Sequence, residues 1–504
     1  MVHQGAPSGE LPTLVGNEGV VSAATAAAPR TPLPARYVDL GVLARGSFGE
    51  VRRVRDVALD RVLVLKLLHA DLAHLAAVRW RFSAEIRVTA ALQHPGVVPV
   101  YDHGELADGR LWYAMKEVRG TTFGAIFTDL HAAASPAGFA VTPGGWTFRR
   151  VVDAFARVVQ TVAYAHRRGV VHRDLKPENL MAGEFGEVLV MDWGLARRVD
   201  QAEPDAPEGA LSGPRGADLT QHGDVLGTPA YMPPEQAMGA RDQHGPPSDV
   251  YALGAILYHL LAGRAPYAGG AREVVQQVRA GPPMPIDDAV ANGPPVPDEL
   301  RRACERAMVR DAGVRCTADA LATELLAWLD GVRRREQAVA ALEAARATEA
   351  EMGALRAKAA EATRAARATW ATLRAFDPVE AKRPAWDLED EAEATGRAVA
   401  LAEARWIQGV HGALSLDPEL PEAHDALAEH YRGALVEAER ERRTLDAARA
   451  EAMLRAHDRG RFAAFLRERA WCRSPPIRRG RRRSCSASSC TTVGWCPWTS
   501  ARSA

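Results

Sequence analysis

The stretch that most constrains this chain of 504 residues is the polar loop Val171 to Asn179. It carries a carboxylate at Asp174 and a carboxamide at Asn179. A second carboxylate, Asp192, follows the apolar run 188–191, which reads as a short buried strand. Carboxylates can accept a proton, and together with amide oxygens they are the ligands that Mg²⁺ prefers. The spacing therefore predicts that these polar groups converge in one site.

Two motifs in this stretch carry a family resemblance. The run 172–179 resembles the catalytic loop of eukaryotic-type protein kinases, and the run 192–194 resembles their Asp-Phe-Gly motif, with Trp193 in place of Phe. The resemblance implies an α+β, two-lobed protein kinase fold, with a small β-rich N-lobe and a larger helical C-lobe. It also implies ATP-dependent phosphoryl transfer, in which the protein supplies mainly positioning and charge stabilisation.

The resemblance assigns a role to each polar residue of these motifs. Asp174 is expected to be the catalytic base, and Lys176 fits the loop of the kinases that act on Ser and Thr rather than Tyr. Asn179 and Asp192 are expected to hold Mg²⁺, with Mn²⁺ as an alternative ion. The implied cofactors are therefore ATP and a divalent cation.

The segment from Tyr37 alternates apolar and polar residues around a glycine turn, which predicts a strand, a turn and a strand. Gly46, Gly49 and Val51 match the phosphate-covering loop of the kinases, whereas Ala44 replaces the first glycine of that motif. Glycine lets backbone amides approach phosphate oxygens closely. These residues are expected to line the nucleotide site.

Further nucleotide-binding residues follow from the same resemblance. Lys66 ends an apolar strand and is expected to contact the phosphates, with Val64 against the adenine. An amphipathic helix over 70–92 presents Glu85 as the partner of Lys66, although a solvated helix face is the simpler interpretation of one acidic residue. The hinge that binds adenine is expected at Met115, Glu117 and Val118.

The later part of the domain is expected to regulate and brace the site. Residues 128–147 predict a loop near the substrate cleft, and 196–225 predict a long activation segment with Thr220 and then Ser212 as candidate phosphorylation sites. Thr228 is expected to contact the protein substrate. By resemblance, Glu235 pairs with Arg315 and Asp249 supports the catalytic loop from below.

Composition excludes several classes of function. Lys plus Arg equals Asp plus Glu at 63 each, so no overall field favours nucleic acid or an anionic membrane. Six Cys in so long a chain do not form a disulfide framework, which is typical of a reducing compartment. No apolar run approaches the eighteen or so residues of a membrane span, and no signal-like segment begins the chain. We therefore expect a cytoplasmic protein with no membrane span and no nucleic-acid partner.

The chain divides into five expected parts. These are a disordered segment over 1–36, the kinase domain over 37–330, a long Ala/Glu/Arg helix over 332–376, a helical region resembling tetratricopeptide repeats over 385–467, and a basic Cys/Ser-rich tail over 469–504. The long helix has a heptad seam interrupted by Glu349, Arg356 and Thr363, which leaves open a coiled coil or a helix packed on its own chain. For the tail, zinc binding, disorder and an out-of-frame sequence remain alternatives.

The function expected from this sequence is that of a bacterial serine/threonine protein kinase, acting on protein substrates and on itself. The C-terminal helices are expected to bind partner proteins, and a homodimer is left open. The alternative function is a pseudokinase scaffold, a binding module without catalysis. Ala44, Val64 and Trp193 are the substitutions that favour this alternative.

Overall fold

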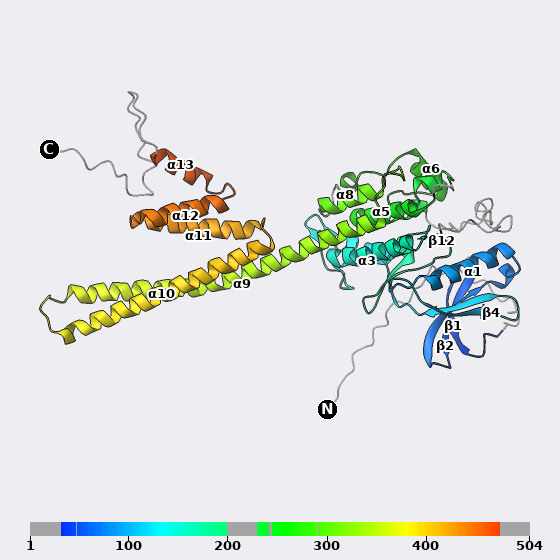
Figure 1. Ribbon diagram of the computed structural model, residues 1–504, viewed down its shortest axis with the longest axis horizontal. Coiled ribbons are helices and arrows are strands. Elements are labelled where there is room, and N and C mark those ends of the chain that lie inside the picture. Colours follow the sequence, from blue (N-terminus) through cyan, green and yellow to red (C-terminus); the bar gives the residue numbers. More distant parts are fainter. Residues whose placement is uncertain (1–31, 47, 199–228, 241–243, 292, 474–504) are drawn as a thin grey trace, which may run out of the picture. The chain divides into compact units, whose positions relative to one another are not determined.

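The computed structural model describes residues 32–46, 48–198, 229–240, 244–291 and 293–473 (Figure 1). The chain divides into two compact units after Gly331. The first unit contains all of the described strands, and the described elements of the second unit are helices. The predicted α+β class with an all-helical region after it is confirmed.

The N-terminal lobe is one antiparallel sheet with a helix packed on it. Its strands lie in the order β1-β2-β3-β5-β4. The apolar side chains of the central strand β3 fill the interior, since Leu65, Leu67 and Leu68 are almost fully buried. Helix α1 packs against β4 and β5. The bounds are β1 Tyr37–Arg45, β2 Gly49–Asp56, β3 Arg61–Leu68, α1 Ala76–Ala91, β4 Val100–Glu105 and β5 Leu111–Lys116.

The C-terminal lobe is mostly helical, with short strands that carry the polar motifs. One three-stranded sheet has the order β11-β10-β6. The loop 172–179 precedes β10, and Asp192 follows β11. The elements are β6 Gly120–Thr122, α2 Phe123–Ala132, β7 Ala134–Ser135, β8 Gly138–Phe139, α3 Phe148–Arg167, β9 Val170–Val171, β10 Leu180–Gly183, β11 Val188–Val190, β12 Arg197–Arg198, α4 Pro234–Ala237, α5 Pro246–Ala262, α6 Ala271–Ala280, α7 Ile286–Ala289 and α8 Asp298–Ala307.

Helices α3 and α5 form the core of this lobe. Helix α3 begins at a capping residue, Thr147, whose hydroxyl accepts a hydrogen bond of 3.1 Å from the amide of Arg150. Helix α5 is apolar nearly all round, as expected for a helix buried on every side. It ends at Gly263, which has a φ of 72° and a left-handed conformation that glycine adopts without strain. These two helices give the catalytic loop a rigid base.

A buried ion pair braces this lobe as predicted from the sequence. Arg315 donates to Glu235 at 2.9 and 3.2 Å, and both side chains are almost fully buried. Ser248 donates a further hydrogen bond of 2.8 Å to the same carboxylate. Removing one partner leaves the other charge buried without compensation, which costs about 3–5 kcal/mol. The pair is therefore a structural element rather than a catalytic one.

We expect Arg315→Met to lower the thermal midpoint of the first unit by roughly 5–15 °C, because a domain of this size loses a few degrees for each kcal/mol. Differential scanning calorimetry measures the shift. Arg167→Met is the matched control, since Arg167 forms an exposed ion pair with Asp319 at 3.3 Å and exposed pairs contribute little. Equal midpoints for the two variants would contradict the assigned role of Arg315.

The second unit is a helical hairpin followed by three shorter helices. The C-terminal part of α9 packs along α10, as Figure 1 shows, and buries Leu342 and Met352 against Trp406 and Val410. A second cluster joins α11, α12 and α13. The bounds are α9 Ala318–Ala371, α10 Val379–Leu416, α11 Pro421–Arg440, α12 Thr444–His457 and α13 Ala463–Arg473.

This hairpin favours one of the two alternatives for the long helix, because α9 packs on its own chain. Two of the polar seam residues have partners on α10: Glu349 accepts a hydrogen bond of 3.0 Å from the indole of Trp406, and Arg356 lies 3.4 Å from Glu403. Such contacts compensate the polar side chains that would interrupt an apolar seam. The homodimer and the repeat-like character of the later helices stay predictions.

Some element boundaries differ from those expected. Helix α9 begins at Ala318 rather than 332 and continues through Gly331, because one glycine inside a helix costs only about 1 kcal/mol. Helix α10 begins at Val379, so Pro384 lies near its start rather than before it. Within the described part of the chain, no helix is long and apolar enough to span a bilayer.

Candidate active site

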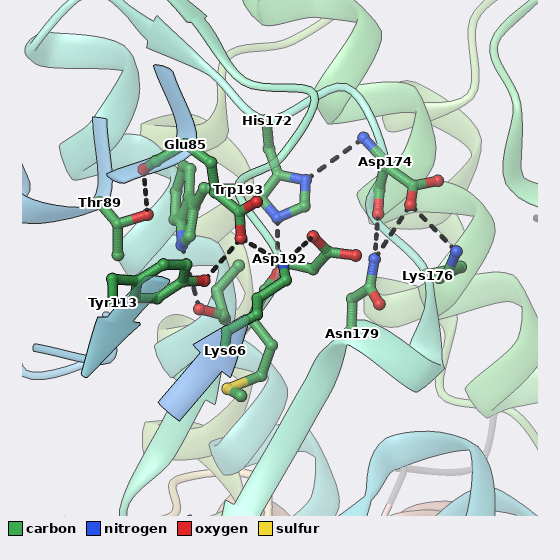
Figure 2. Close-up of polar contacts among 12 residues, drawn as sticks. Lys66, Glu85, Thr89, Tyr113, His172, Asp174, Lys176, Asn179, Asp192 and Trp193 are labelled. Atoms are coloured by element: carbon green, nitrogen blue, oxygen red, sulfur yellow. Dashed lines mark hydrogen bonds and ion pairs between the residues drawn. The ribbon is translucent and has the colours of Figure 1, made fainter. Parts of the chain in front are cut away.

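Lys66 lies on strand β3, and its side chain is paired with a carboxylate on helix α1. Its ammonium lies 2.5 Å from the carboxylate of Glu85 on α1 and 3.8 Å from Asp192 (Figure 2). Burial opposes its charged form, but the two carboxylates outweigh burial and raise the pKa of Lys66. Lys66 therefore stays cationic and faces the cleft, and Glu85 occupies the position that the sequence predicted for its partner.

Hydrogen bonds anchor the catalytic loop, 172–179, to Asp249, which lies near the start of α5. Asp249 is buried and accepts hydrogen bonds from the backbone amides of His172 at 2.7 Å and Arg173 at 2.8 Å. The imidazole of His166 lies 2.8 Å from the same carboxylate. Burial opposes ionisation of Asp249, but the His166 contact foremost, and then the neighbouring His172 and the amide of Arg173, lower its pKa. Arg173 has a φ of 71°, a left-handed conformation that these bonds help to hold.

Three polar side chains meet at the end of this loop. The Lys176 ammonium lies 3.0 Å from one carboxylate oxygen of Asp174. The Asn179 amide nitrogen donates to the backbone carbonyl of Asp174 at 2.8 Å and to its carboxylate at 3.2 Å. The three predicted residues are therefore in direct contact. Because the Asn179 nitrogen is the donor, its carbonyl oxygen remains available to a cation.

Asp192 is presented to the cleft by strand β11 and by the residue after it. Its φ of 56° is left-handed, and its side chain is 51% exposed. Burial opposes ionisation of Asp192, but nearby charges, Lys66 foremost, lower its pKa. The Trp193 indole is buried against the His172 ring, and its N–H donates to the carbonyl of Val190 at 3.1 Å. A phenylalanine could not form that bond, so Trp193 adds a tether beside Asp192.

A cavity of about 1000 Å³ joins these groups. It is lined by eight of the residues predicted for the site: Gly46, Gly49, Val51, Lys66, Glu85, Asp174, Lys176 and Asp192. Five other predicted residues do not line it: Val64, Met115, Glu117, Val118 and Asn179. Asn179 nonetheless contacts Asp174, and Val64 lies opposite Met115 where β3 and β5 pair. The cavity therefore corresponds to the phosphate and acceptor end of the predicted site.

The turn between β1 and β2 requires glycine at position 49, whereas alanine stands at position 44, the first glycine position of the kinase motif. A Cβ at Gly49 would collide with the carbonyl of Leu67 on β3, so only glycine fits there. Ala44, by contrast, lies within β1 and pairs with Val51 just after a register shift between Val42 and Ala44, so the strand pairing continues with alanine at this position. The amide of Gly46 bonds to the carbonyl of Gly49 at 2.8 Å and closes the turn.

Residues 128–147 were expected to be a loop near the substrate cleft, but they continue α2 and form the β7–β8 hairpin, and none of them lines the cavity. Phe139 of this hairpin stacks on Phe148 at 4.5 Å, which packs the segment onto α3 instead. Ser212, Thr220 and Thr228 lie outside the described residues.

Sequence reasoning missed Tyr113, the residue on β5 whose hydroxyl donates to Glu85 at 2.7 Å. Tyr113 lies two residues before Met115 on β5, and both pack in the cluster formed with α1, whereas Trp112 and Ala114 pack on the other side. Its contact with a carboxylate on α1 depends on how the helix packs, and no local pattern indicates it.

Comparisons with known proteins agree with this geometry. The family model described as the protein kinase domain matches residues 37–326, more than half of the chain. The chain belongs to the protein kinase family. This kinase domain is 36% identical over 241 residues to the serine/threonine-protein kinase PknD of Protochlamydia amoebophila, covering 46% of this chain and 24% of that protein. It is 37% identical over 256 residues to PknB of Mycobacterium tuberculosis, covering 50% and 36%.

A third relative extends the similarity slightly. The probable serine/threonine-protein kinase of Streptomyces coelicolor is 35% identical over 306 residues, covering 59% of this chain and 41% of that protein. The match to this chain thus covers about a quarter to two fifths of the length of these curated relatives. The aligned lengths of 241 to 306 residues are close to the length of the matched kinase domain.

Proposed function

We propose that this chain is a serine/threonine protein kinase that transfers the γ-phosphoryl group of ATP to hydroxyl groups of protein substrates and of itself. The observation that carries the proposal is the arrangement of charge around one cavity. Lys66, paired with Glu85, lies on one side, and Asp174 with Lys176 lies on the other. Phosphoryl transfer requires a cation for the phosphates and a carboxylate for the acceptor around one cavity, and this arrangement supports the proposal.

The donor set also fits a divalent cation. Asp192 offers a half-exposed carboxylate and Asn179 offers a carbonyl oxygen, and Mg²⁺ is usually bound by one or two such groups with waters and phosphates completing its shell. When bound, Mg²⁺ or Mn²⁺ would neutralise charge on the phosphates. In the described residues no cluster of three or more His, Cys, Asp or Glu could hold a metal by itself, which agrees with a cation that is bound together with its nucleotide.

The residues of the chain then divide the work of the reaction. Asp174 accepts or orients the proton of the substrate hydroxyl, and Lys176, 3.0 Å away, balances its charge. Lys66 contacts phosphate oxygens, and Glu85 keeps its ammonium in place. The adenine is expected to be bound at the backbone of residues 115–118. Lys176 fits the loop of kinases that act on Ser and Thr, and the names of the relatives agree with Ser and Thr as acceptors.

The pseudokinase alternative is not favoured by the geometry. Ala44 and Val64 both take part in strand pairing, opposite Val51 and Met115, and the Trp193 indole donates a hydrogen bond to the carbonyl of Val190. We further propose that the protein works in the cytoplasm. We also propose that the helices after Gly331 bind partner proteins, since their packing leaves large apolar side chains such as Leu401 of α10 and Leu445 of α12 exposed.

Mass spectrometry of the purified full-length chain tests the proposal. Incubation with ATP and Mg²⁺ should add 80-Da groups, about the mass of one phosphoryl unit each, to Ser or Thr residues of the chain and of a generic protein substrate. Omission of the cation, or its removal by a chelator, should abolish the addition. Phosphate found on neither Ser nor Thr under any of these conditions would refute the proposed activity.

A further inference from the structure

Tyr113 lies where the N-terminal sheet meets helix α1. Its Cα is the direct partner of Lys66 where β5 pairs with β3, so both side chains lie on the same face of the sheet. The Tyr113 side chain is 4% exposed, and its ring packs against Phe82 of α1 with centroids 5.5 Å apart. The Lys66 ammonium lies 5.9 Å from the centroid of the same ring. Tyr113 is therefore fixed by strand pairing and by packing.

The hydroxyl of Tyr113 reaches the carboxylate that pairs with Lys66. It donates a hydrogen bond of 2.7 Å to Oε1 of Glu85, the same oxygen that lies 2.5 Å from the Lys66 ammonium. Figure 2 shows the three side chains pointing toward one another. Burial foremost, and then the Glu85 charge, raise the pKa of Tyr113 well above its usual value, so the phenol keeps its proton and remains a donor.

Lys66 and Tyr113 both donate to Glu85, but they differ in how firmly they can fix the position of its carboxylate. Lys66 is a flexible side chain whose ammonium must also serve phosphate oxygens, whereas Tyr113 has a rigid ring on a central strand. Helix α1 has no side-chain hydrogen bond at its N-cap, Leu75, and Arg79 ties its first turn to Glu105 of β4 at 2.9 Å, whereas Tyr113 contacts the turn that carries Glu85. A hydrogen bond from the sheet to a buried carboxylate is of the charge-assisted kind, which is stronger than a neutral one.

We propose that Tyr113 is a positioning residue that ties helix α1 to the sheet and holds the Glu85 carboxylate in reach of Lys66, whether or not a nucleotide is bound. The proposal rests on the proposed kinase function for its effect on turnover. The tether itself is a property of the fold. Its consequence is that the Lys66–Glu85 pair is assembled before ATP arrives, so less binding energy is used to order the site.

Tyr113→Phe tests the tether, since it removes one hydroxyl and keeps the packed ring. Tyr164→Phe is the matched control: among the described residues the Tyr164 hydroxyl has no hydrogen-bond partner, although it is buried. Hydrogen exchange of the full-length chain without nucleotide should show the segment Ala76–Ala91 exchanging roughly tenfold faster in Tyr113→Phe and unchanged in Tyr164→Phe. Equal exchange in wild type and Tyr113→Phe would overturn the proposal.

Kinetics then tests whether the tether acts through Glu85. We expect Tyr113→Phe to lower kcat/KM for ATP about tenfold while KM for the protein substrate stays unchanged, a split that general destabilisation would not produce. In a Glu85→Ala background the same substitution should cause no further loss. Additive losses would contradict an action through Glu85. If wild type transfers no phosphoryl group, the proposed function fails, and the exchange of α1 alone still decides the tether.

Discussion

Asp174→Asn should lower kcat by about 10²–10⁴-fold, the range that a general base contributes. The substitution keeps the size of the side chain, and its amide oxygen can still face Lys176 and Asn179, which contact Asp174 at 3.0 and 3.2 Å. What is lost is the negative charge that accepts or orients the acceptor proton. Steady-state kinetics at saturating ATP measures the loss as a change in kcat.

Nucleotide affinity should change little in this variant, because Lys66 and Asp192 are untouched. Asp153→Asn is the matched control, since Asp153 also pairs with a cation, Arg157 at 2.9 Å, but lies on an exposed face of α3. The control should retain wild-type kcat. If Asp174→Asn retained wild-type kcat as well, Asp174 would not be the base.

Lys66→Met should lower kcat/KM for ATP by about 10²–10³-fold, comparable to the loss of one preorganised electrostatic group in other active sites. Lys66 is the cation closest to both Glu85 and Asp192, at 2.5 and 3.8 Å. Its removal takes away a phosphate contact and leaves the buried Glu85 carboxylate without its ammonium partner. Both effects act on the nucleotide, so the binding of a fluorescent ATP analogue should weaken in parallel with turnover.

The control for this second variant is Lys358→Met, which removes an exposed lysine that pairs with Glu391 at 3.1 Å in the second unit. It should leave both the affinity and kcat/KM at wild-type values. Wild-type affinity and turnover in Lys66→Met would show that the cavity next to Lys66 does not hold the phosphates.

The polar motifs could be predicted because each is local in sequence. Asp174, Lys176 and Asn179 lie within one short loop, so their sequence spacing alone keeps them near one another. The role of Asp249 near the start of α5 was predicted from the resemblance of the run 249–254 to a kinase motif. The resemblance to kinases then supplied the roles of these residues.

What could not be predicted depends on packing between distant segments. The bond from Tyr113 to Glu85 joins residues 28 positions apart, and it exists because α1 lies on the face of the sheet that Tyr113 occupies. The sequence did not decide between a coiled coil and a helix packed on its own chain for the same reason. Glu349 interrupts the apolar seam of α9, and its hydrogen-bond partner Trp406 on α10 could not be inferred from periodicity. Periodicity gives the face of a helix but not its partner.

The most direct test of the account is a single-turnover measurement of phosphoryl transfer from [γ-³²P]ATP to a Ser/Thr-containing protein, with the full-length wild type and Asp174→Asn compared at saturating nucleotide. The account predicts label on Ser or Thr in the wild type, at least a roughly 10²-fold slower transfer in the variant, and equal nucleotide affinity in both. Equal transfer rates in the two proteins, or no label on Ser or Thr with the wild type, would contradict it.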